Sequence, residues 1–298
     1  MKINGVQIDN TFAEAFPMKA TRLIITARNM DWAYNAANAA TGFATSVIAC
    51  GCEGGIEREL KPRETPDGRP GLAILLFTMG GKDMGKQIQN RVGQCVLTCP
   101  TTACFSGMAD GDKVALGKNL RFFGDGWQIA KRFDRKRYWR VPVMDGEFLC
   151  EETTYMNKGI GGGNFLILAE TQDQALAASE KAIQAMRKVP EVIMPFPGGV
   201  VRSGSKIGSQ YEGLPASTND AFCPTLKGQV ESRLTEATGS VMEIVIDGLN
   251  EAAVKAATRA GIRAACSLGV DRGIHRISAG NYGGNLGPFH FHLREIVK

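Results

Sequence analysis

The sequence lacks an apolar run long enough to cross a membrane. Its longest unbroken apolar stretch, LAILLF at residues 72–77, is far shorter than the ~20 residues that span a bilayer. The N-terminal segment MKINGVQIDN has no apolar core of the kind found in secretory signals. We therefore expect a cytoplasmic protein with no membrane partner.

Cysteine is too sparse for a fold held together by disulfides. Eight cysteines in 298 residues, without a signal peptide, indicate reduced thiols. Neither Cys50-x-Cys52 nor the spacing of Cys95, Cys99 and Cys104 matches an iron–sulfur motif. A net charge of +5 is too mild for a dedicated nucleic-acid binder, but it suits acidic small ligands. We therefore expect no nucleic-acid partner.

Three motifs resemble known sites but lack a required part. His290 and His292 share one strand face without an evident third ligand, so we expect ordinary strand histidines and no metal. The stretch KGIGGGNF at 158–165 opens a strand, whereas a dinucleotide-binding loop opens a helix. The S-x-x-K spacing of Ser203 and Lys206 needs a helix, and neighbouring glycines argue against one.

What the sequence does contain is an internal repeat of strand and helix patterns. Arg91-Val92-Gly93 in the first copy matches Arg259-Ala260-Gly261 in the second, which lies 168 positions later. Asn29, Thr171 and Asn250 are good helix N-caps, and Gln174 completes a capping box with Thr171. The first copy comprises residues 22–27, 29–43, 45–57, 71–79 and 82–96, and the second comprises 163–170, 171–186, 191–201, 240–248 and 249–268.

Each copy reads strand–helix–strand twice, which is the split βαβ or ferredoxin-like arrangement. We predict an α+β fold with an internal duplication: two ferredoxin-like lobes with antiparallel sheets, at residues 1–150 and 151–298. The N-terminal lobe would carry an inserted loop and strand region. The Gly- and Ser-rich segments 99–112 and 202–226 are long enough to be functional loops.

One carboxylate, Glu243, lies inside the apolar strand SVMEIVIDG at 240–248. Superposing the repeats places it opposite Leu75 or Ile74, so the second copy has an acid where the first has a core side chain. Strand alternation puts Glu243 on the same face as Val241 and Val245. A buried carboxylate must be paired, hydrated or protonated at a raised pKa. A salt bridge to a nearby Arg or Lys is the ordinary alternative.

Two basic segments are candidate binding sites. In PFPGGVVRSGSKIGS at 195–209, backbone N–H groups of glycines and two basic side chains favour an anion site, with a flexible surface loop as the alternative. The run KRFDRKRYWR at 131–140 interleaves Tyr138 and Trp139 with six basic residues, as in short RNA-binding segments. A solvated strand with basic outer positions is the simpler interpretation.

The chain resembles one enzyme family from end to end. The segments that carry the resemblance are MKINGVQIDNTFAEAF, ATGFATSVI, TPDGRPG, GQCVLTCPT, FFGDG, GGGNF, PFPGGVV, LPASTNDAFCPT, EIVIDGLNEAAVKAA and SAGNYGGNLG. Together they are similar to the formylmethanofuran:tetrahydromethanopterin formyltransferases of methanogenic archaea and their relatives. The resemblance implies two ferredoxin-like lobes, a homotetramer built as a dimer of dimers, and a cleft near a subunit contact.

The resemblance also implies a reaction: transfer of a formyl group from formylmethanofuran to N5 of tetrahydromethanopterin in archaeal one-carbon metabolism and methanogenesis. Both carriers would be substrates, with no metal or prosthetic group. Glu243 resembles the family's glutamate and would supply a proton. The expected substrate contacts are Gly198, Gly199, Arg202, Ser205, Lys206, Ser217, Thr218, Asn219, Asp220 and Asn281. A non-catalytic tandem ferredoxin-like module that senses a ligand or binds RNA is the alternative.

Overall fold

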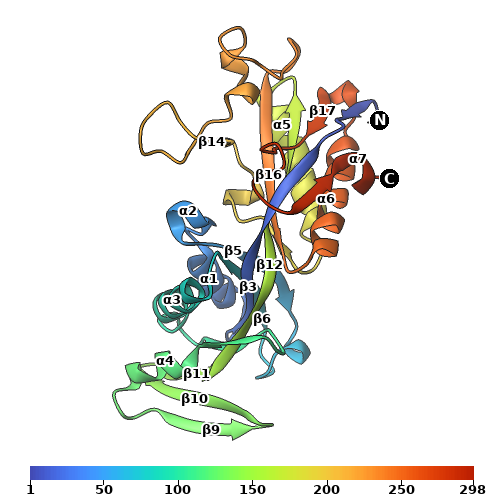
Figure 1. Ribbon diagram of the computed structural model, residues 1–298. Helices are drawn as coiled ribbons and strands as arrows, with labels where there is room; N and C mark the ends of the chain where they lie inside the picture. Colours follow the sequence, from blue (N-terminus) through green and yellow to red (C-terminus); the bar gives the residue numbers. More distant parts are fainter. The chain divides into compact units, whose positions relative to one another are not determined.

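The computed structural model describes residues 1–298, which form two units (Figure 1). The continuous unit comprises Met18–Gly159, and the split unit comprises Met1–Pro17 together with Ile160–Lys298. These compact units divide the chain at 159/160, and the predicted lobes at 1–150 and 151–298 stay a prediction. The N-terminal residues belong with the C-terminal half. They do so because β2 (Val6–Ile8) pairs with a strand near the C-terminus, where Ile8 lies opposite Ile277.

The continuous unit is an antiparallel sheet with two helices on one face. Its central strands run in the order β7, β3, β6, β5, and every neighbouring pair in that order is antiparallel. Alanines of α1 and apolar side chains of α3 pack with Leu72, Ile74 and Leu76 in one core. The elements are β3 (Phe12–Thr26), α1 (Met30–Thr41), β4 (Thr45–Ser46), α2 (Val47–Cys50), β5 (Cys52–Leu60), β6 (Gly71–Thr78), α3 (Gly81–Arg91), β7 (Ala103–Ser106), β8 (Asp112–Ala115), α4 (Gly117–Leu120), β9 (Ile129–Phe133), β10 (Lys136–Val143), β11 (Gly146–Glu151) and β12 (Thr153–Ala169).

The split unit repeats this order with β17, β12, β16 and β13, again antiparallel throughout. Helices α5 and α6 pack against each other and against the face of β16 that carries Met242, Ile244 and Ile246 (Figure 1). The elements are β1 (Lys2–Ile3), β2, α5 (Gln172–Met186), β13 (Val192–Ile193), β14 (Lys206–Ile207), β15 (Ala216–Ser217), β16 (Ser240–Gly248), α6 (Glu251–Cys266), β17 (Ile274–Ser278), β18 (Phe289–His292) and α7 (Leu293–Ile296).

The duplication predicted from the sequence thus corresponds to two copies of one strand order in an α+β fold. The expectation of purely antiparallel sheets is wrong at one edge of each unit. Strand β2 pairs with β17 in parallel, and β11 pairs with β7 in parallel. Both parallel pairs add strands outside the repeated pattern, so the sheet is mixed.

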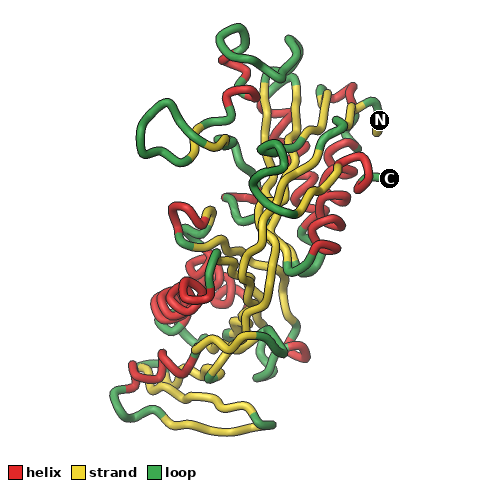
Figure 2. Tube along the Cα trace, in the orientation of Figure 1, coloured by secondary structure: helices red, strands yellow, loops and turns green.

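Two predicted strands are shorter than expected. In 45–57, the helix α2 interrupts the strand because Ser46 caps Ile48 N–H and Gly51 ends the turn at φ 72°. In 191–201, only β13 and an isolated bridge at Val201 pair with β16, because the prolines there have no N–H to donate. Most of the chain between β13 and β16 is therefore loop (Figure 2).

Candidate active site

Glu243 lies on the face of β16 that the helices leave free. Its neighbours Met242 and Ile244 are buried in the helix-covered core, whereas Val241, Glu243 and Val245 are half-buried. The strand is held on both sides: Glu243 is opposite Leu166 of β12, and it exchanges two backbone hydrogen bonds of 2.8 and 2.9 Å with Val201. The backbone at Glu243 is therefore fixed, and its carboxyl projects away from the helices.

A small pocket of about 30 Å³ surrounds this carboxyl. That volume holds about one water molecule or a group of similar size. The walls come from β12, β16 and the loop that follows the bridge at Val201. The lining residues are Leu166, Val201, Arg202, Ser203, Gly204, Asn219, Phe222, Cys223, Val241 and Glu243.

The Glu243 carboxyl forms no salt bridge, although Arg202 lines the same pocket. Desolvation among Leu166, Val241 and Phe222 raises the pKa of Glu243 to about 7. The residue keeps some exposure, while its carboxyl is largely desolvated. Near neutral pH the group is therefore about equally divided between acid and carboxylate, which suits proton transfer.

The loop opposite Glu243 is ordered by its own polar contacts. The Lys206 ammonium forms an ion pair with Asp220, and this contact holds the pKa of Asp220 below its usual range. Strands β14 and β15 pair Lys206 with Ser217. Gly204, at φ 58°, has Asn219 3.1 Å from where a Cβ would lie, so a side chain there would push Asn219 out of the pocket wall.

The remaining predicted contacts in this loop do not line the pocket. Ser217 Oγ donates to Gly208 O at 2.8 Å, and Thr218 Oγ1 donates to Ser203 O at 3.3 Å. Ser205 lies 3.5 Å from the Tyr282 hydroxyl, which donates to Ser205 O at 3.2 Å. Of the predicted residues, the structure therefore brings only Arg202 and Asn219 to the pocket of Glu243.

Gly198 and Gly199 form a turn, with φ of 67° and 89°. Gly199 N–H is used within the turn, where it donates to Phe196 O at 2.7 Å. A Cβ at Gly199 would lie 2.5 Å from Ile183 of α5, so close packing against the helix explains this glycine. An anion contact at these two residues stays a prediction.

Asn281 belongs to a loop, residues 280–287, that a buried acid organises. The carboxylate of Glu14, a residue 1% exposed, accepts hydrogen bonds from four backbone N–H groups of this loop. Burial alone would raise the pKa of Glu14, but these four bonds outweigh it and hold the pKa below its usual value. Asn281 itself donates to Thr11 Oγ1 and Phe12 O. The four donors are Tyr282, Gly284, Leu286 and Gly287.

Glu14 and Asn164 were missed in the sequence analysis. The Asn164 side chain, in the GGGNF segment, accepts a hydrogen bond from Gly280 N–H at 2.7 Å and donates one to Gly280 O at 3.2 Å. It therefore fixes the start of the same loop. A signal for Glu14 was present. It is an acid among apolar residues in NTFAEAF, the same pattern that marked Glu243.

Two matches to family models cover almost the whole chain. Residues 1–143 match the model described as formylmethanofuran-tetrahydromethanopterin formyltransferase, and residues 146–296 match the model of its proximal lobe. The chain belongs to this formyltransferase family. It is accordingly an acyltransferase.

Relatives of this formyltransferase come from bacteria and archaea. A formylmethanofuran–tetrahydromethanopterin formyltransferase of Methylococcus capsulatus is 71% identical over the full length of both chains. The crystal structure of the formyltransferase/hydrolase complex FhcABCD from Methylorubrum extorquens, in complex with methylofuran, contains a chain with a TM-score of 0.97 and 50% identity, covering 100% of this chain and 99% of that one. The Methanosarcina barkeri formyltransferase has a TM-score of 0.95 and 46% identity, covering 99% and 100%.

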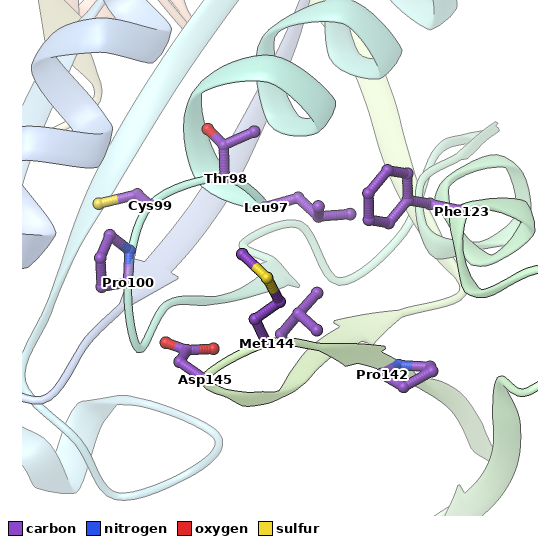
Figure 3. Close-up of a pocket in the computed structure, with 9 residues that line it drawn as sticks. Leu97, Thr98, Cys99, Pro100, Phe123, Pro142, Met144 and Asp145 are labelled. Carbon is purple, nitrogen blue, oxygen red and sulfur yellow. The ribbon is translucent and has the colours of Figure 1, made fainter.

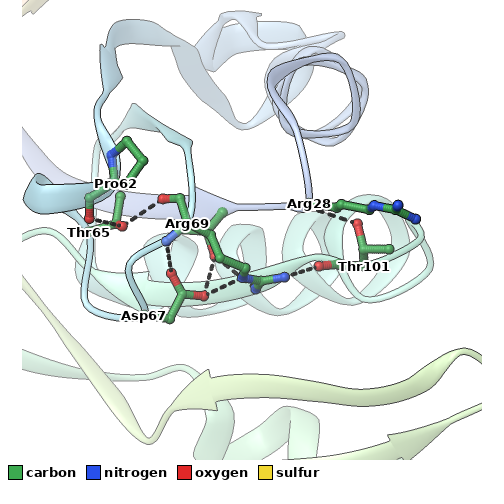
Figure 4. Close-up of polar contacts among 7 residues, drawn as sticks. Arg28, Pro62, Thr65, Asp67, Arg69 and Thr101 are labelled. Carbon is green, nitrogen blue, oxygen red and sulfur yellow. Dashed lines mark hydrogen bonds and ion pairs between the residues drawn. The ribbon is translucent and has the colours of Figure 1, made fainter.

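The TPDGRPG segment of this formyltransferase has a structural role (Figure 4). Asp67 accepts hydrogen bonds from Thr26 Oγ1 at 2.7 Å and from Arg69 Nε at 2.8 Å. Arg69 in turn donates to Thr26 Oγ1 and to Thr101 O, so the loop between β5 and β6 is tied to two other segments of the continuous unit. The TPDGRPG segment therefore fixes local structure in this unit.

Other candidate groups have ordinary surroundings. His290 and His292 are exposed on one face of β18 and pack on Phe12, at ring-centroid distances of 4.7 and 5.3 Å. All eight cysteines are free thiols. No group of three or more His, Cys, Asp or Glu side chains is placed to hold a metal ion. None of the helices combines the length and apolarity needed to cross a membrane.

The continuous unit carries a larger, mainly apolar pocket of about 670 Å³ (Figure 3). Leu97, Phe123 and Met144 point into it from three segments. Met144 is fully exposed, and Phe122, Phe123 and Trp127 are each more than 60% exposed. These four side chains, together with the pocket, are referred to below as the apolar patch. Large exposed apolar areas of this kind mark interaction surfaces.

Proposed function

We propose that this formyltransferase moves a formyl group from the amine nitrogen of formylmethanofuran to N5 of tetrahydromethanopterin, with both carriers as substrates and no metal or prosthetic group. Family membership supports the reaction. The observation that carries the site is one carboxyl, Glu243, with a pKa of about 7 at the floor of a pocket. Acyl transfer between two amines needs proton transfer and oxyanion stabilisation, and no change of oxidation state.

In the proposed mechanism, N5 of the acceptor attacks the formyl carbon and forms a tetrahedral intermediate. After the attack, N5 still carries a proton that must leave. The methanofuran nitrogen must gain a proton before its C–N bond to the formyl carbon breaks. Protonated Glu243 gives its proton to the leaving amine, and the carboxylate then takes the N5 proton, so the group returns to its starting state. Asn219 and Arg202, which line the same pocket, are the donors we assign to the oxyanion.

The activity is tested by mixing the protein with the two carriers and following the N5-formyl product by absorbance. We expect turnover by the wild type. Glu243→Gln should keep the oligomeric state and lower kcat by ~10²-fold or more, the usual scale for a lost general acid. Glu212→Gln is the matched control, because Glu212 is exposed in the loop outside the pocket. Near-normal turnover of Glu243→Gln would remove Glu243 from the mechanism but leave the reaction assigned.

The relatives support a role for this reaction in one-carbon metabolism, but they do not identify a more specific pathway. The archaeal methanogenic role expected from the sequence has little support, because the Methylococcus capsulatus relative is 71% identical and the Methanosarcina barkeri chain is 46% identical. We therefore propose the reaction without a methanogenic pathway. The ferredoxin-like assignment of each lobe is supported by the two matching strand orders.

We also propose that the enzyme self-associates as a homotetramer, a dimer of dimers, through the apolar patch. Four exposed large apolar side chains, two of which (Phe123 and Met144) line the pocket, support an interface. Phe123→Ser with Met144→Ser should lower the molar mass measured by light scattering. Leu176→Ser, at an exposed position on α5, is the control. A monomeric wild type would contradict self-association; the Methylorubrum extorquens relative belongs to a complex of different subunits, so the patch would then suit a different chain.

A further inference from the structure

A second pocket, of about 250 Å³, lies on the continuous unit where the β9–β10 hairpin meets β8 and β12. Five of its lining side chains are cationic and only two are carboxylates. The proposed formyl transfer makes no use of it. The lining residues are Lys113, Arg132, Arg135, Lys136, Arg137, Glu151, Glu152, Thr153 and Tyr155.

Both carboxylates in this pocket are already paired. Glu151, whose side chain is 4% exposed, contacts Lys136 at 3.0 Å, and Glu152 contacts Arg137 at 3.3 Å. Burial alone would lower the pKa of Lys136, but Glu151 outweighs it and holds the pKa above its ordinary value. The other three cations, Lys113, Arg132 and Arg135, form no ion pair or side-chain hydrogen bond. The pocket therefore has an excess of uncompensated positive charge.

Strand pairing fixes where these charges lie. Lys113 of β8 is opposite Tyr155 of β12, whose carbonyl accepts a 2.7 Å hydrogen bond from Thr21. Arg132 of β9 is directly opposite Arg137 of β10. Two like charges directly across an antiparallel pair destabilise a hairpin. Glu152 already compensates Arg137, so Arg132 is the cation of this pair that has no partner, and a bound anion would compensate it.

The turn of the hairpin also bears a cost. Asp134 and Arg135 join β9 to β10 with φ of 45° and 67°. Two-residue turns of this type prefer Asn-Gly or Asp-Gly, because a side chain is strained at positive φ. Arg135 occupies the position that suits glycine, and its guanidinium lines the pocket. Strain of this kind is typical of functional positions.

The aromatic residues of this run do not form a platform for stacked bases. Trp139 is 7% exposed and packs in the core beneath Arg121, at 4.5 Å from its guanidinium carbon to the ring centroid. Tyr138 contacts Phe105 and Phe133. Single-stranded RNA binding uses successive free aromatic faces along a groove. The basic side chains therefore line a compact pocket and not an RNA track.

We propose that this pocket binds a compact, multiply charged phosphate ligand, such as inorganic pyrophosphate or the polyphosphate group of a nucleotide. Arg132 and Arg135 present planar guanidinium groups that match phosphate oxygens in pairs. Lys113 adds a point charge, and the hydroxyls of Thr153 and Tyr155 add neutral donors. No apolar wall is available for a large ring, so the phosphate groups provide the recognition.

The test is isothermal titration of the full-length protein with tripolyphosphate, ATP, citrate and a short unstructured RNA. We expect saturable binding of tripolyphosphate that weakens with salt. Arg132→Gln should weaken it by about tenfold, the usual scale of one lost charge-assisted contact. Equal affinity for tripolyphosphate and ATP indicates the phosphate chain alone as the ligand, and tighter ATP binding indicates a nucleotide source.

Two further variants make the test decisive. Arg135→Gly should raise the apparent Tm without ligand, because glycine suits φ 67°, and should also weaken tripolyphosphate binding. Lys131→Gln removes the same charge from the same hairpin outside the pocket lining, and it should leave binding unchanged. Equal weakening by Lys131→Gln, tighter binding of citrate or RNA, or no binding of tripolyphosphate would each overturn the proposal.

Discussion

Strands β6 and β16 occupy the same position in the two units, but the charged groups on the faces away from the helices differ: those beside β6 are paired, and the acid on β16 is not. All eight residues of β6 are buried, and Leu75 lies opposite Arg22. Arg22 donates to both oxygens of Glu57 at 2.6 and 2.7 Å. On β16 the corresponding face carries Glu243 opposite Leu166, with no cation bound to it. One copy satisfies its buried charges and builds structure, whereas the other leaves one acid unsatisfied, which is where chemistry is expected.

The largest effect should come from removing the Arg22–Glu57 ion pair of the continuous unit. Arg22→Met removes the guanidinium that pairs with Glu57, whose side chain is 1% exposed. We expect a loss of about 3–5 kcal/mol in the free energy of unfolding, the usual cost of separating a buried ion pair. Urea denaturation measures it. Adding Glu57→Leu should restore most of the stability, and no recovery would mean that the pair is not what holds this face.

Glu14 offers the same contrast within the split unit, because it is an acid with four backbone donors. Glu14→Ala should cost about 3 kcal/mol, since buried N–H groups lose their acceptor. Its pKa is lowered in the folded protein, so the stability it contributes is present above the ordinary carboxyl pKa and is lost as pH falls through the folded value. Denaturation across acidic pH measures this loss. If Glu14→Ala lost stability at acidic pH in the same way as the wild type, Glu14 would not be the source of this loss.

Glu243 should show the opposite sign. Its pKa is raised to about 7, so its unfavourable contribution grows as pH rises from its ordinary value through the folded value. Glu243→Leu should therefore stabilise the protein by at most about 3 kcal/mol above neutral pH and by little in acid. Activity should be lost in the same variant. Stabilisation that does not vary with pH would show that desolvation of the acid is not its source.

The smallest effect is the pH dependence of the wild-type rate. If protonated Glu243 is the acid, kcat/KM should fall by about tenfold per pH unit above about 7. A stopped or continuous absorbance assay over alkaline pH measures the slope. In Glu243→Gln, the residual rate should not show this decrease at alkaline pH. A decrease that persists in the variant would assign the titration to another group.

The repeated elements were predictable because their signals are local. Helices α1, α5 and α6 begin after Asn29, Thr171 and Asn250, whose side chains cap the helices as expected. The equivalence of Glu243 with Leu75, and not Ile74, needed the structure. Ile74 lies in the core with the helices, as Ile244 does, so burial decides the alignment.

The rest depended on long-range contacts that no local pattern encodes. The loop 280–287 is shaped by Glu14, more than 260 positions earlier in the chain. The ion pair of Asp220 with Lys206 was not predictable, because the β14–β15 hairpin that carries Lys206 is very short; a substrate contact at Asp220 stays a prediction. The basic run was expected to be one solvated strand, but it forms a hairpin of β9 and β10 that turns at Asp134 and Arg135. Its pocket arises only when β9 and β10 meet β8 and β12.

The division of the chain into a continuous unit and a split unit has a consequence for biosynthesis. Residues 18–159 contain all of β4 to β11 and the parts of β3 and β12 that belong to the continuous unit, so we expect this part to fold as a unit during synthesis. Residues 1–17 are made before this part but need β17, which pairs with β2 and is made only after the continuous unit. Strand β2 must therefore wait until β17 has been made. Its docking is therefore expected to be a late, slow step of folding.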